Sequence, residues 1–354
     1  MRTNQRLFLD VHAIQTVPPS NINRDDTGSP KTAQYGGVTR ARVSSQSWKK
    51  AIRQYFLEHG GMSNVGVRSL EIVRYVAGKI VNIDASIEMD EAMNMAEEVL
   101  NSAKVRTTKD QKARALFFIS SKQAEKLAQA AIAGEKSKSK LQELLKNDPA
   151  IDIALFGRMV ADDPKLNEDA SSQFGHAIST HEVQTEFDFF TATDDFSSTD
   201  DAGAGMLGTV EYNSSTLYRY ANVAVHEFSR QIGDKTSVMN ALKLFVEAFV
   251  KSMPTGKINT FANQTLPQAL LVCLRGDRPV SLVSAFERPI RSSEGYVEKS
   301  IRQLGNECKA IEQWVDAPMF AFSLGMGDFD GNQTSLNQLL EELEATLDSL
   351  LNSN

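Results

Sequence analysis

The sequence RVSSQSWKKA, residues 42–51, decides most of the predicted fold. Just before it, residues 38–43 alternate so that Arg40 and Arg42 share one face, as in a β-strand. From its Trp48 onward, large apolar side chains recur at the spacing of one helix face, at Trp48, Ile52, Tyr55 and Phe56. The serines between these two patterns are typical of a helix N-cap. The stretch therefore predicts a strand that leads directly into a capped helix.

Basic and polar side chains surround this junction. They are Arg24, Lys31, Arg40, Arg42, Ser44, Ser45, Gln46, Lys49, Lys50 and Arg53. Free backbone N–H groups at the start of the helix, together with hydroxyl groups and positive charges, favour a phosphate ligand. Because such contacts do not read bases, binding would tolerate any sequence and weaken with salt. The alternative is a set of serine caps beside a solvated basic helix face, and the residues alone leave both interpretations open.

The charges of the chain are unevenly distributed. The 354 residues include 38 basic and 45 acidic side chains, which gives a net charge of -7. Residues 1–60 nevertheless hold nine basic and four acidic side chains, a net charge of +5, so the remainder carries -12. Every charged side chain in residues 310–354 is acidic. The amino-terminal part can therefore present a polyanion-binding surface while other faces repel polyanions.

The composition excludes several classes of protein. With 41% hydrophobic residues, a chain of this length can bury a sizeable core and is not disordered. Cys273 and Cys308 stand apart without a second pair, so neither a disulfide framework nor a zinc knuckle is indicated. No secretory signal is found, and no uncharged apolar stretch approaches the roughly 18 residues that span a bilayer. We therefore expect a soluble, cytoplasmic protein without a membrane segment, a bound metal or a cofactor.

The remaining patterns predict an α+β fold. Strand-like alternation occurs in residues 7–14, 179–191, 211–226, 268–274 and 280–286. Helical periodicity occurs in residues 87–146, 238–253 and 336–351, and the last helix is expected to pack within the chain. Tyr218 and Tyr220 are likewise expected to pack, although a stacking platform for RNA bases is the alternative. Strands near both ends with helices between them imply a sheet core with insertions.

Patterns that would indicate catalysis are weak. His176 and His181 are spaced for one face of neither a helix nor a strand, so a metal site is not favoured. Residues 254–257, PTGK, are similar to the end of a phosphate-binding loop, but Lys251 stands where the earlier glycine belongs. Acidic pairs occur among turn-forming residues, at Asp25-Asp26, Asp162-Asp163, Asp194-Asp195 and Asp200-Asp201. The first pair lies beside the basic residues, which keeps a metal-dependent nuclease open.

Several stretches together resemble one known family. They are residues 23–26 (NRDD), Lys31, 35–37 (YGG), 42–51 (RVSSQSWKKA), 152–159 (DIALFGRM), 176–181 (HAISTH), 190–192 (FTA) and 218–222 (YRYAN). In this order they closely resemble the CasC-type backbone subunit of the type I-E CRISPR surveillance complex, Cascade, a member of the RAMP superfamily. The resemblance spans most of the chain.

The resemblance implies a right-hand-like protein. Its palm would be RRM-derived, that is ferredoxin-like, with a helical fingers insertion and a β-hairpin thumb. The expected first part of the palm is residues 1–58, with the RNA-binding loop and helix. Fingers are expected in residues 59–180, a thumb in residues 181–217, and the second part of the palm, with the C-terminal helix, in residues 218–354.

The resemblance also implies roles for individual residues. The RNA backbone would be held by Arg24, Lys31, Ser44, Ser45, Gln46, Lys49 and Arg53. Met159, Phe190 and Thr191 would pack against bases where the RNA is kinked. The fingers of the family carry a lysine-rich stretch associated with target DNA, which is matched here by Lys136, Lys138 and Lys140. Without the family, Met159 and Phe190 would be expected in the core.

The function implied by the resemblance is non-catalytic. Several copies would polymerise along CRISPR RNA, bind its phosphates independently of sequence, kink it at regular intervals and present guide bases for pairing with target DNA in antiviral defence. The implied partners are CRISPR RNA, target DNA, neighbouring copies of the chain and other Cascade subunits. Base pairing would then supply the specificity, as in other RNA-guided systems.

Two other functions remain open from the sequence. Relatives in the same superfamily cleave RNA through a loop aspartate, and Asp25 or Asp26 would be that residue here. A general single-stranded RNA-binding protein that works without partners is the second. It would bind any RNA tightly as a monomer, whereas a backbone subunit needs neighbouring copies and a processed guide.

Overall fold

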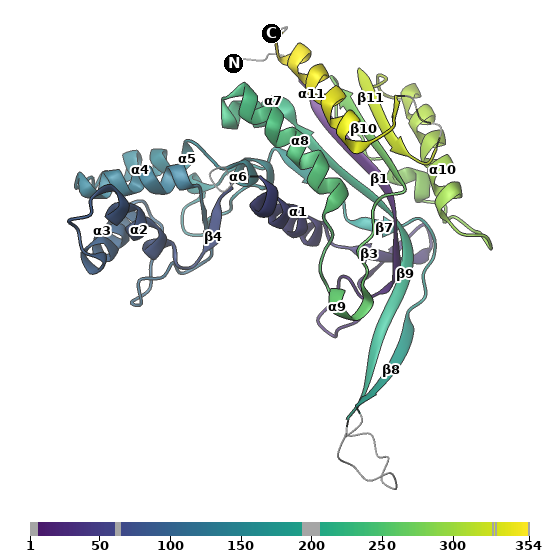
Figure 1. Cartoon of the computed structure of the whole chain (residues 1–354), viewed down its shortest axis with the longest axis horizontal. Coiled ribbons are helices and arrows are strands. Elements are labelled where there is room, and N and C mark those ends of the chain that lie inside the picture. Colours follow the sequence, from purple (N-terminus) through teal and green to yellow (C-terminus); the bar gives the residue numbers. More distant parts are fainter. Residues whose placement is uncertain (1–5, 61–64, 193–205, 328, 330, 353–354) are drawn as a thin grey trace.

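The computed structural model describes residues 6–60, 65–192, 206–327, 329 and 331–352. A large sheet with helices on both faces forms the body, and a helical lobe extends from one side of it (Figure 1). A long hairpin, named the arm here, projects from the body in another direction (Figure 1). The mixed architecture of one large sheet with helices agrees with the predicted fold class.

The sheet has ten strands in the described residues. They are β1 (Phe8–Ser20), β2 (Thr32–Tyr35), β3 (Val38–Val43), β6 (Ser172–Phe174), β7 (Ala177–Ser179), β8 (Glu186–Ala192), β9 (Met206–Ala224), β10 (Ala269–Arg275), β11 (Phe320–Gly325) and β12 (Asn332–Gln333). Their order is β12-β11-β10-β1-β9-β7-β3-β2, with β6 and β8 also paired to β9. The pairs are antiparallel except for β11 with β12.

The centre of the sheet is β1, as its sequence requires. Both faces of this strand are buried, because Val11 faces one helical layer while Ile14 packs with the other. Val11 lies opposite Ala221 of β9 and Val272 of β10. The predicted strands around residues 7–14, 38–43, 211–226 and 268–274 are confirmed.

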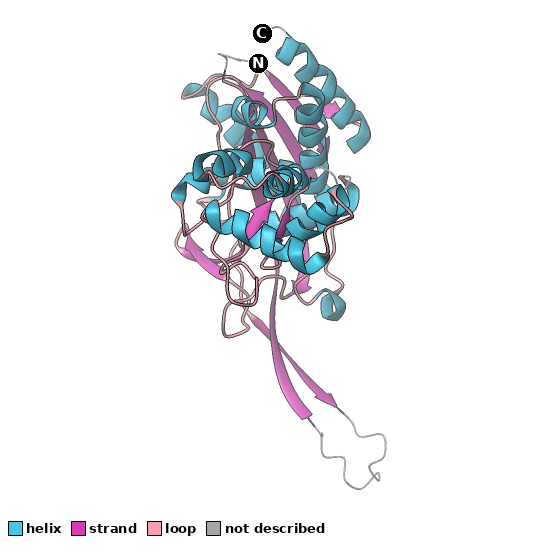
Figure 2. Ribbon diagram, turned by 90° about the vertical axis from the view of Figure 1, so that its left-hand side faces the viewer, coloured by secondary structure: helices cyan, strands magenta, loops and turns pink. Residues whose placement is uncertain are grey.

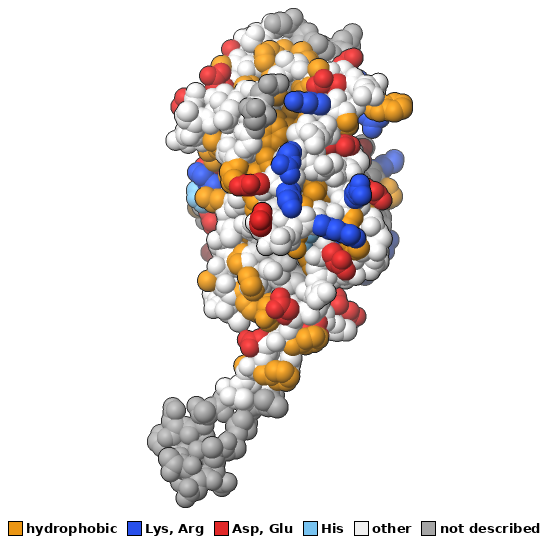
Figure 3. Space-filling model, turned by 90° about the vertical axis from the view of Figure 1, so that its right-hand side faces the viewer, with side chains coloured by type: hydrophobic (Ala, Val, Ile, Leu, Met, Phe, Trp, Pro, Cys, Tyr) orange, Lys and Arg blue, Asp and Glu red, His pale blue; other side chains and the backbone are white. Residues whose placement is uncertain are grey.

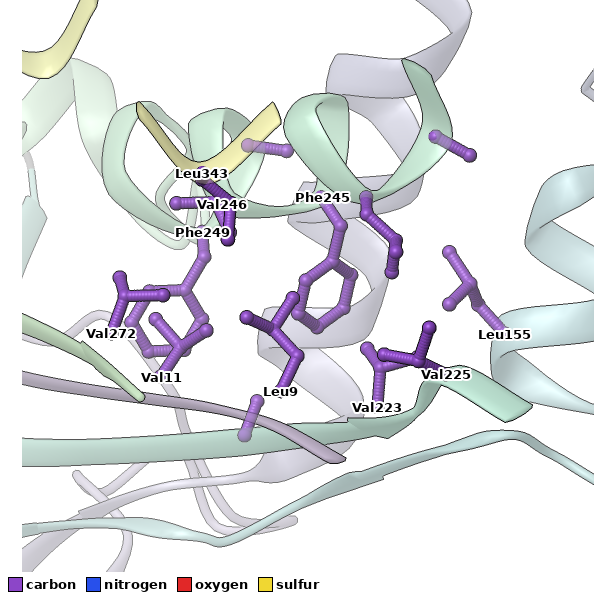
Figure 4. Packing of buried hydrophobic residues seen from close by; sticks show 14 of the residues in the cluster. Leu9, Val11, Leu155, Val223, Val225, Phe245, Val246, Phe249, Val272 and Leu343 are labelled. Carbon is purple, nitrogen blue, oxygen red and sulfur yellow. The ribbon is translucent and has the colours of Figure 1, made fainter. Parts of the chain in front are cut away.

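Five helices cover one face of the sheet. They are α1 (Ser45–His59), α6 (Ile151–Phe156), α7 (Val225–Ile232), α8 (Lys235–Lys251) and α11 (Leu336–Asn352). In Figure 4, Phe245 and Phe249 of α8 point toward Leu9 and Val11 of the sheet, and Leu343 of α11 lies beyond them. Each such fully buried side chain contributes roughly 1.5–3 kcal/mol. The predicted packing of the C-terminal helix within the chain is confirmed.

The opposite face is covered by η3 (Val283–Phe286), α10 (Val297–Ala310) and η4 (Ile311–Gln313). Figure 3 shows this side of the molecule, where Lys and Arg side chains lie beside strips of apolar side chains. The predicted strand over residues 280–286 is wrong. Val280 N–H donates to Asp10 and Leu282 N–H donates to the Tyr218 hydroxyl, so side chains satisfy the backbone here and the segment turns instead of pairing.

Tyr218 and Tyr220 pack within this layer, which confirms the packing interpretation over a stacking platform. Tyr218 is buried with its hydroxyl 2.9 Å from His12 Nδ1, and the Tyr220 hydroxyl donates to Asp10 at 3.0 Å. Burial of the Asp10 carboxyl raises its pKa to about 6. These polar groups satisfy one another beneath α10.

The helical lobe has a hydrophobic core of its own. Its elements are β4 (Val67–Ser69), α2 (Ile72–Ile83), α3 (Met89–Ser102), β5 (Phe117–Ile119), α4 (Ser121–Ile132) and α5 (Lys138–Lys146). Figure 2 shows the lobe facing the viewer, in front of the body. Ser120 and Gln123 form a reciprocal capping box at the start of α4. Helical periodicity predicts helices only from residue 87 and so does not find α2, which lies within the helical fingers expected from the resemblance over residues 59–180.

Two short helices complete the described elements, η2 (Pro164–Leu166) and α9 (Ile258–Phe261). In the arm, β8 pairs with the first part of β9, from Glu186 opposite Tyr212 to Ala192 opposite Met206. The acidic pairs Asp194-Asp195 and Asp200-Asp201 lie outside the described residues. Among the helices that are described, none is long and apolar enough to cross a membrane.

Candidate nucleic-acid interface

The junction of β3 and α1 is built as predicted, but its backbone donors are occupied. Ser44 caps the helix, and its side chain accepts from Gln46 N–H. The N–H groups of Ser47 and Trp48 donate to the Ser44 carbonyl oxygen. The N–H of Ser44 itself donates to Asn23 at 2.8 Å, and Ser45 N–H donates to a ring nitrogen of His176 at 3.0 Å. The prediction that these N–H groups are free for a phosphate is wrong, because Ser44 itself accepts three of them and side chains of other loops accept the remaining two.

Arg40 also differs from the prediction. It is fully buried, and its guanidinium donates to the carbonyl oxygens of Tyr35, Ser179 and Phe286. Loops that follow β2, β7 and η3 are thereby tied together. Arg40 therefore has a structural role and is not accessible to RNA.

Lys31 and Arg42 remain at the surface beside the junction. Both side chains are half-buried, and Arg42 donates to the carbonyl oxygen of Thr32. The pKa of His176 is lowered first by burial and then by the positive charges of Arg42 and Lys31. A positive field therefore exists where His176 meets the start of α1.

A groove between α1 and the helical lobe brings several predicted residues together. This lobe groove has a volume of about 600 Å³ and is lined by Gln46, Lys49, Lys50, Arg53, Phe118 and Met159, among others. Met159 is 85% exposed, so the expectation that it belongs to the core is wrong. The groove therefore combines cationic side chains from α1 with a free apolar side chain.

Within the lobe groove, Arg53 is held by the protein. Its guanidinium forms an ion pair with Asp152 at 2.8 Å, donates to Gly66 and lies over the Phe118 ring. Burial raises the pKa of Asp152, and the charge of Arg53 opposes that shift. Arg53 thus links α1 to the lobe, and a phosphate ligand would have to share it with Asp152.

Lys49 lies beside Arg53 in a different environment. Its ammonium group is 5.4 Å from the centre of the Phe174 ring, in a cation–π arrangement. Partial burial lowers the pKa of Lys49. An anion next to this ammonium group would replace the hydration that burial removes.

A second groove lies on the other side of α1. This loop groove has a volume of about 690 Å³ and is lined by Arg24, Ser47, Lys50, Thr255, Gly256 and Lys257, among others. Lys50 lines both grooves, so they adjoin along the helix. The sequence interpretation found Arg24 and Lys50 but missed Lys257. The signal was the PTGK stretch, which fails as a nucleotide-binding loop yet places a lysine at this surface.

Phe190 and Thr191 lie on the arm. Phe190 is 41% exposed, and its ring covers Gly208 on the neighbouring strand. Thr191 is exposed. The arm projects away from the body, so these two residues are not brought together with Met159 in one chain (Figure 1).

The lysine-rich stretch of the lobe is paired with carboxylates. Lys136 contacts Glu98 at 2.7 Å, Lys138 contacts Asp163 at 3.0 Å, and Lys140 contacts Glu135 at 3.0 Å. Helix α5 begins at Lys138, so the predicted mobile loop is partly helical.

Asp25 and His181, two of the groups weighed for catalysis, have structural partners. Asp25 accepts the N–H groups of Thr27 and Ser29, and the Thr27 hydroxyl lowers its pKa most strongly. His181 accepts from Thr216 N–H through Nε2 and lies 2.7 Å from the Glu182 carbonyl through Nδ1. The described part of the chain contains no cluster of three or more His, Cys, Asp or Glu side chains that could hold a metal.

Comparison with known proteins agrees with this architecture. The family model described as CT1975-like protein matches residues 9–353. A chain of a solved structure described as "CRISPR RNA-guided surveillance complex, pre-nicking" is 32% identical, with a TM-score of 0.83 over 96% of this chain and 100% of that chain. A chain from another CRISPR RNA-guided surveillance complex is 29% identical, with a TM-score of 0.65 over 96% of this chain and 99% of that chain. No curated protein matches the sequence.

Proposed function

Because the chain belongs to the CT1975-like protein family, we propose that it is a non-catalytic backbone subunit of a CRISPR RNA-guided surveillance complex of the Cascade type. The match to chains of such complexes along almost the whole length supports this proposal. The finer assignment is the CasC-type subunit of a type I-E complex, which works in the cytoplasm. Its partners are CRISPR RNA, target DNA, further copies of this chain and other subunits.

The observation that best supports RNA binding is the pair of adjoining grooves along α1. Lys50 lines both grooves, Gln46 and Lys49 line the lobe groove, and Arg24 lines the loop groove. Side chains that contact phosphates position a strand without reading its bases. A single RNA strand laid across α1 is therefore held independently of sequence, as a guide of variable sequence requires.

The contact with kinked bases needs two copies of the chain. Met159 stands exposed at the lobe groove, while Phe190 and Thr191 lie on the projecting arm (Figure 1). If copies polymerise along the RNA, the arm of one copy reaches the groove of its neighbour and separates the guide into short segments. Met159 and Phe190 are both exposed, so both are accessible for such a contact.

In this proposal the body acts as an RRM-derived palm, the lobe as fingers and the arm as a thumb. Residues 1–58 and 218–354 form the palm, residues 59–180 the fingers and residues 181–217 the thumb. Lys136, Lys138 and Lys140 are assigned to target DNA. The pair of Lys136 with Glu98 is exposed on both sides, and such a pair is weak enough for a phosphate to replace the carboxylate. Asp163, the partner of Lys138, is buried, so that pair is held more firmly.

The test is purification of the complex through this subunit, followed by native mass measurement and analysis of bound RNA. A particle that contains several copies of the chain and one processed guide is expected. A monomer that binds any RNA equally well would contradict the proposal and support a general RNA-binding protein.

Nuclease activity is tested on the same particle. With magnesium and matched RNA, the particle is expected to leave the RNA intact, because Asp25 already accepts hydrogen bonds from its own turn. Cleavage that disappears in Asp26→Ala would instead identify a loop-aspartate endoribonuclease.

A further inference from the structure

The loop groove contains a turn whose position is fixed by backbone contact. A Cβ atom added to Gly256 would lie 2.1 Å from the carbonyl oxygen of Ile22, so no other residue fits there without displacing backbone. The turn at residues 254–257 is thereby packed against the loop that carries Arg24. Two segments far apart in the sequence form one wall of the groove.

Lys257, the residue after this glycine, has an unusual backbone conformation. Its φ of 47° lies in the left-handed region, which costs a residue with a side chain of order 1 kcal/mol or more. Strained residues of this kind persist where the surroundings fix them, and they concentrate at ligand-binding sites. The strain places the Lys257 side chain at the groove, where it is half-buried.

The groove gathers positive charge with little compensation. Arg24, Lys50 and Lys257 all line it, and none forms an ion pair with a carboxylate in the part of the chain that the structure describes. Lys251 also lines the groove but is paired with Glu247 at 2.6 Å, and Glu58 is the one acidic residue of the lining. Three cations held near one another repel, and a bound anion would relieve that repulsion.

A hydroxyl group at the same groove is left without a partner. Ser252 is 7% exposed, and its Oγ is buried with no hydrogen-bond partner in the described structure. Ser47 and Thr255 contribute further hydroxyl groups to the lining.

We propose that the loop groove is a phosphate subsite in which Lys257 and Thr255 join Arg24 and Lys50 to bind the ribose-phosphate backbone of RNA. The inference rests on the proposed function and extends the RNA path beyond α1. Lys50 lines both grooves, so a strand that leaves Lys49 and Met159 in the lobe groove enters the loop groove without leaving the protein. The PTGK stretch thus binds phosphate by charge and hydroxyl groups, without the geometry of a nucleotide-binding loop.

The first test measures, per bound copy of the chain, the salt dependence of binding to a processed guide RNA under conditions in which neighbouring copies assemble along it. Lys257→Gln removes the charge and keeps a polar side chain, while Lys257→Arg keeps the charge. The matched control is Lys109→Gln, at an exposed position in the lobe. In Lys257→Gln the slope of log K against log salt is expected to be less steep by about 0.7, the contribution of one phosphate contact to a single strand. Lys257→Arg and the control should keep the wild-type slope.

An unchanged slope in Lys257→Gln overturns the inference while leaving the proposed function intact. Weaker binding with an unchanged slope also overturns it, because that result indicates a structural role for Lys257. Failure of the wild-type chain to bind RNA would count against the proposed function itself, so the two failures are distinguishable.

A second measurement does not depend on substitution. Lysine acetylation by a water-soluble reagent, read by mass spectrometry, is compared for the complex with its RNA and after nuclease treatment. We expect Lys257 and Lys50 to be protected only while RNA is bound, and Lys109 to react equally in both. Protection by inorganic phosphate but not by RNA would overturn the assignment to RNA and indicate a site for a free anion.

Discussion

The helical lobe and the body of the protein both present lysines, but these lysines face different surroundings. In the lobe, Lys136, Lys138 and Lys140 each contact a carboxylate within 3.0 Å. Beside α1, Lys50 and Lys257 have no carboxylate partner among the described residues. The number of lysines in a stretch therefore does not measure its free positive charge. That free charge depends on whether the lysines form ion pairs with carboxylates distant in the sequence.

The largest expected effect concerns the arginine that fixes the lobe beside its groove. Arg158 is buried, and its guanidinium donates to the carbonyl oxygens of Leu166, Phe118 and Leu145. Arg158→Ala leaves these oxygens without donors, so we expect a loss of roughly 3–5 kcal/mol in the free energy of unfolding. Urea denaturation measures it. A loss below about 1 kcal/mol would mean that water replaces the guanidinium.

The next effect tests the link between the two regions. Arg53→Ala leaves the buried carboxylate of Asp152 without its cation, and we expect a loss of roughly 2–4 kcal/mol at neutral pH. Arg68→Ala is the matched control, since Arg68 is exposed on β4. It should change stability by no more than about 0.5 kcal/mol.

The pH dependence of this variant sharpens the test. Burial raises the pKa of Asp152 above its unfolded value, so the folded state holds this proton more tightly than the unfolded state. Stability from this group is therefore present at low pH and is lost as the pH rises through the folded pKa. The cost of Arg53→Ala should be larger at pH 8 than at pH 4. An equal loss of stability at both pH values would contradict the assignment of Asp152 as an ionised carboxylate paired with Arg53.

The third prediction compares the regions directly through RNA binding. Arg24→Ala with Lys50→Ala removes two unpaired charges, so the slope of log K against log salt should become less steep by about 1.4. Lys136→Ala with Lys140→Ala removes two paired lysines from the lobe. That pair of substitutions should leave the RNA slope unchanged, and an equal effect from both pairs would invalidate the comparison.

The smallest effect should appear when one lobe lysine is released. Glu98→Gln removes the partner of Lys136, and both side chains are more than half exposed. Exposed pairs contribute about 0–1 kcal/mol, so target DNA should bind at most a few-fold more tightly to complexes that carry this variant. Weaker DNA binding in a gel-shift titration would show that Lys136 does not contact DNA.

Local features of the body were predictable from the sequence. The strand at residues 38–43, the Ser44 cap and the apolar stripe of α1 depend on nearest neighbours along the chain, and the structure has all three. The burial of the C-terminal leucines follows from their helical spacing alone.

What sequence reasoning missed depends on contacts between distant segments. Arg40 alternates with Arg42 as predicted, yet the carbonyl oxygen of Phe286 and its neighbours enclose it. The start of α1 would have free donors if His176 and Asn23 did not reach it. The position of Lys257 is fixed by the close approach of Gly256 to Ile22, in the loop before β2. No periodicity in the sequence reports such partners.

The continuity of β9 has a mechanical consequence. One strand of 19 residues pairs with β8 in the arm and with β1 in the centre of the sheet. The arm is therefore a rigid extension of the sheet. Its direction is set by β9, the strand that also crosses the middle of the body. Inserting two residues into each of β8 and β9 would lengthen it by about 7 Å while every side chain keeps its face. The length of the arm can thus change in steps of two residues per strand without any change in the hydrophobic core of the body.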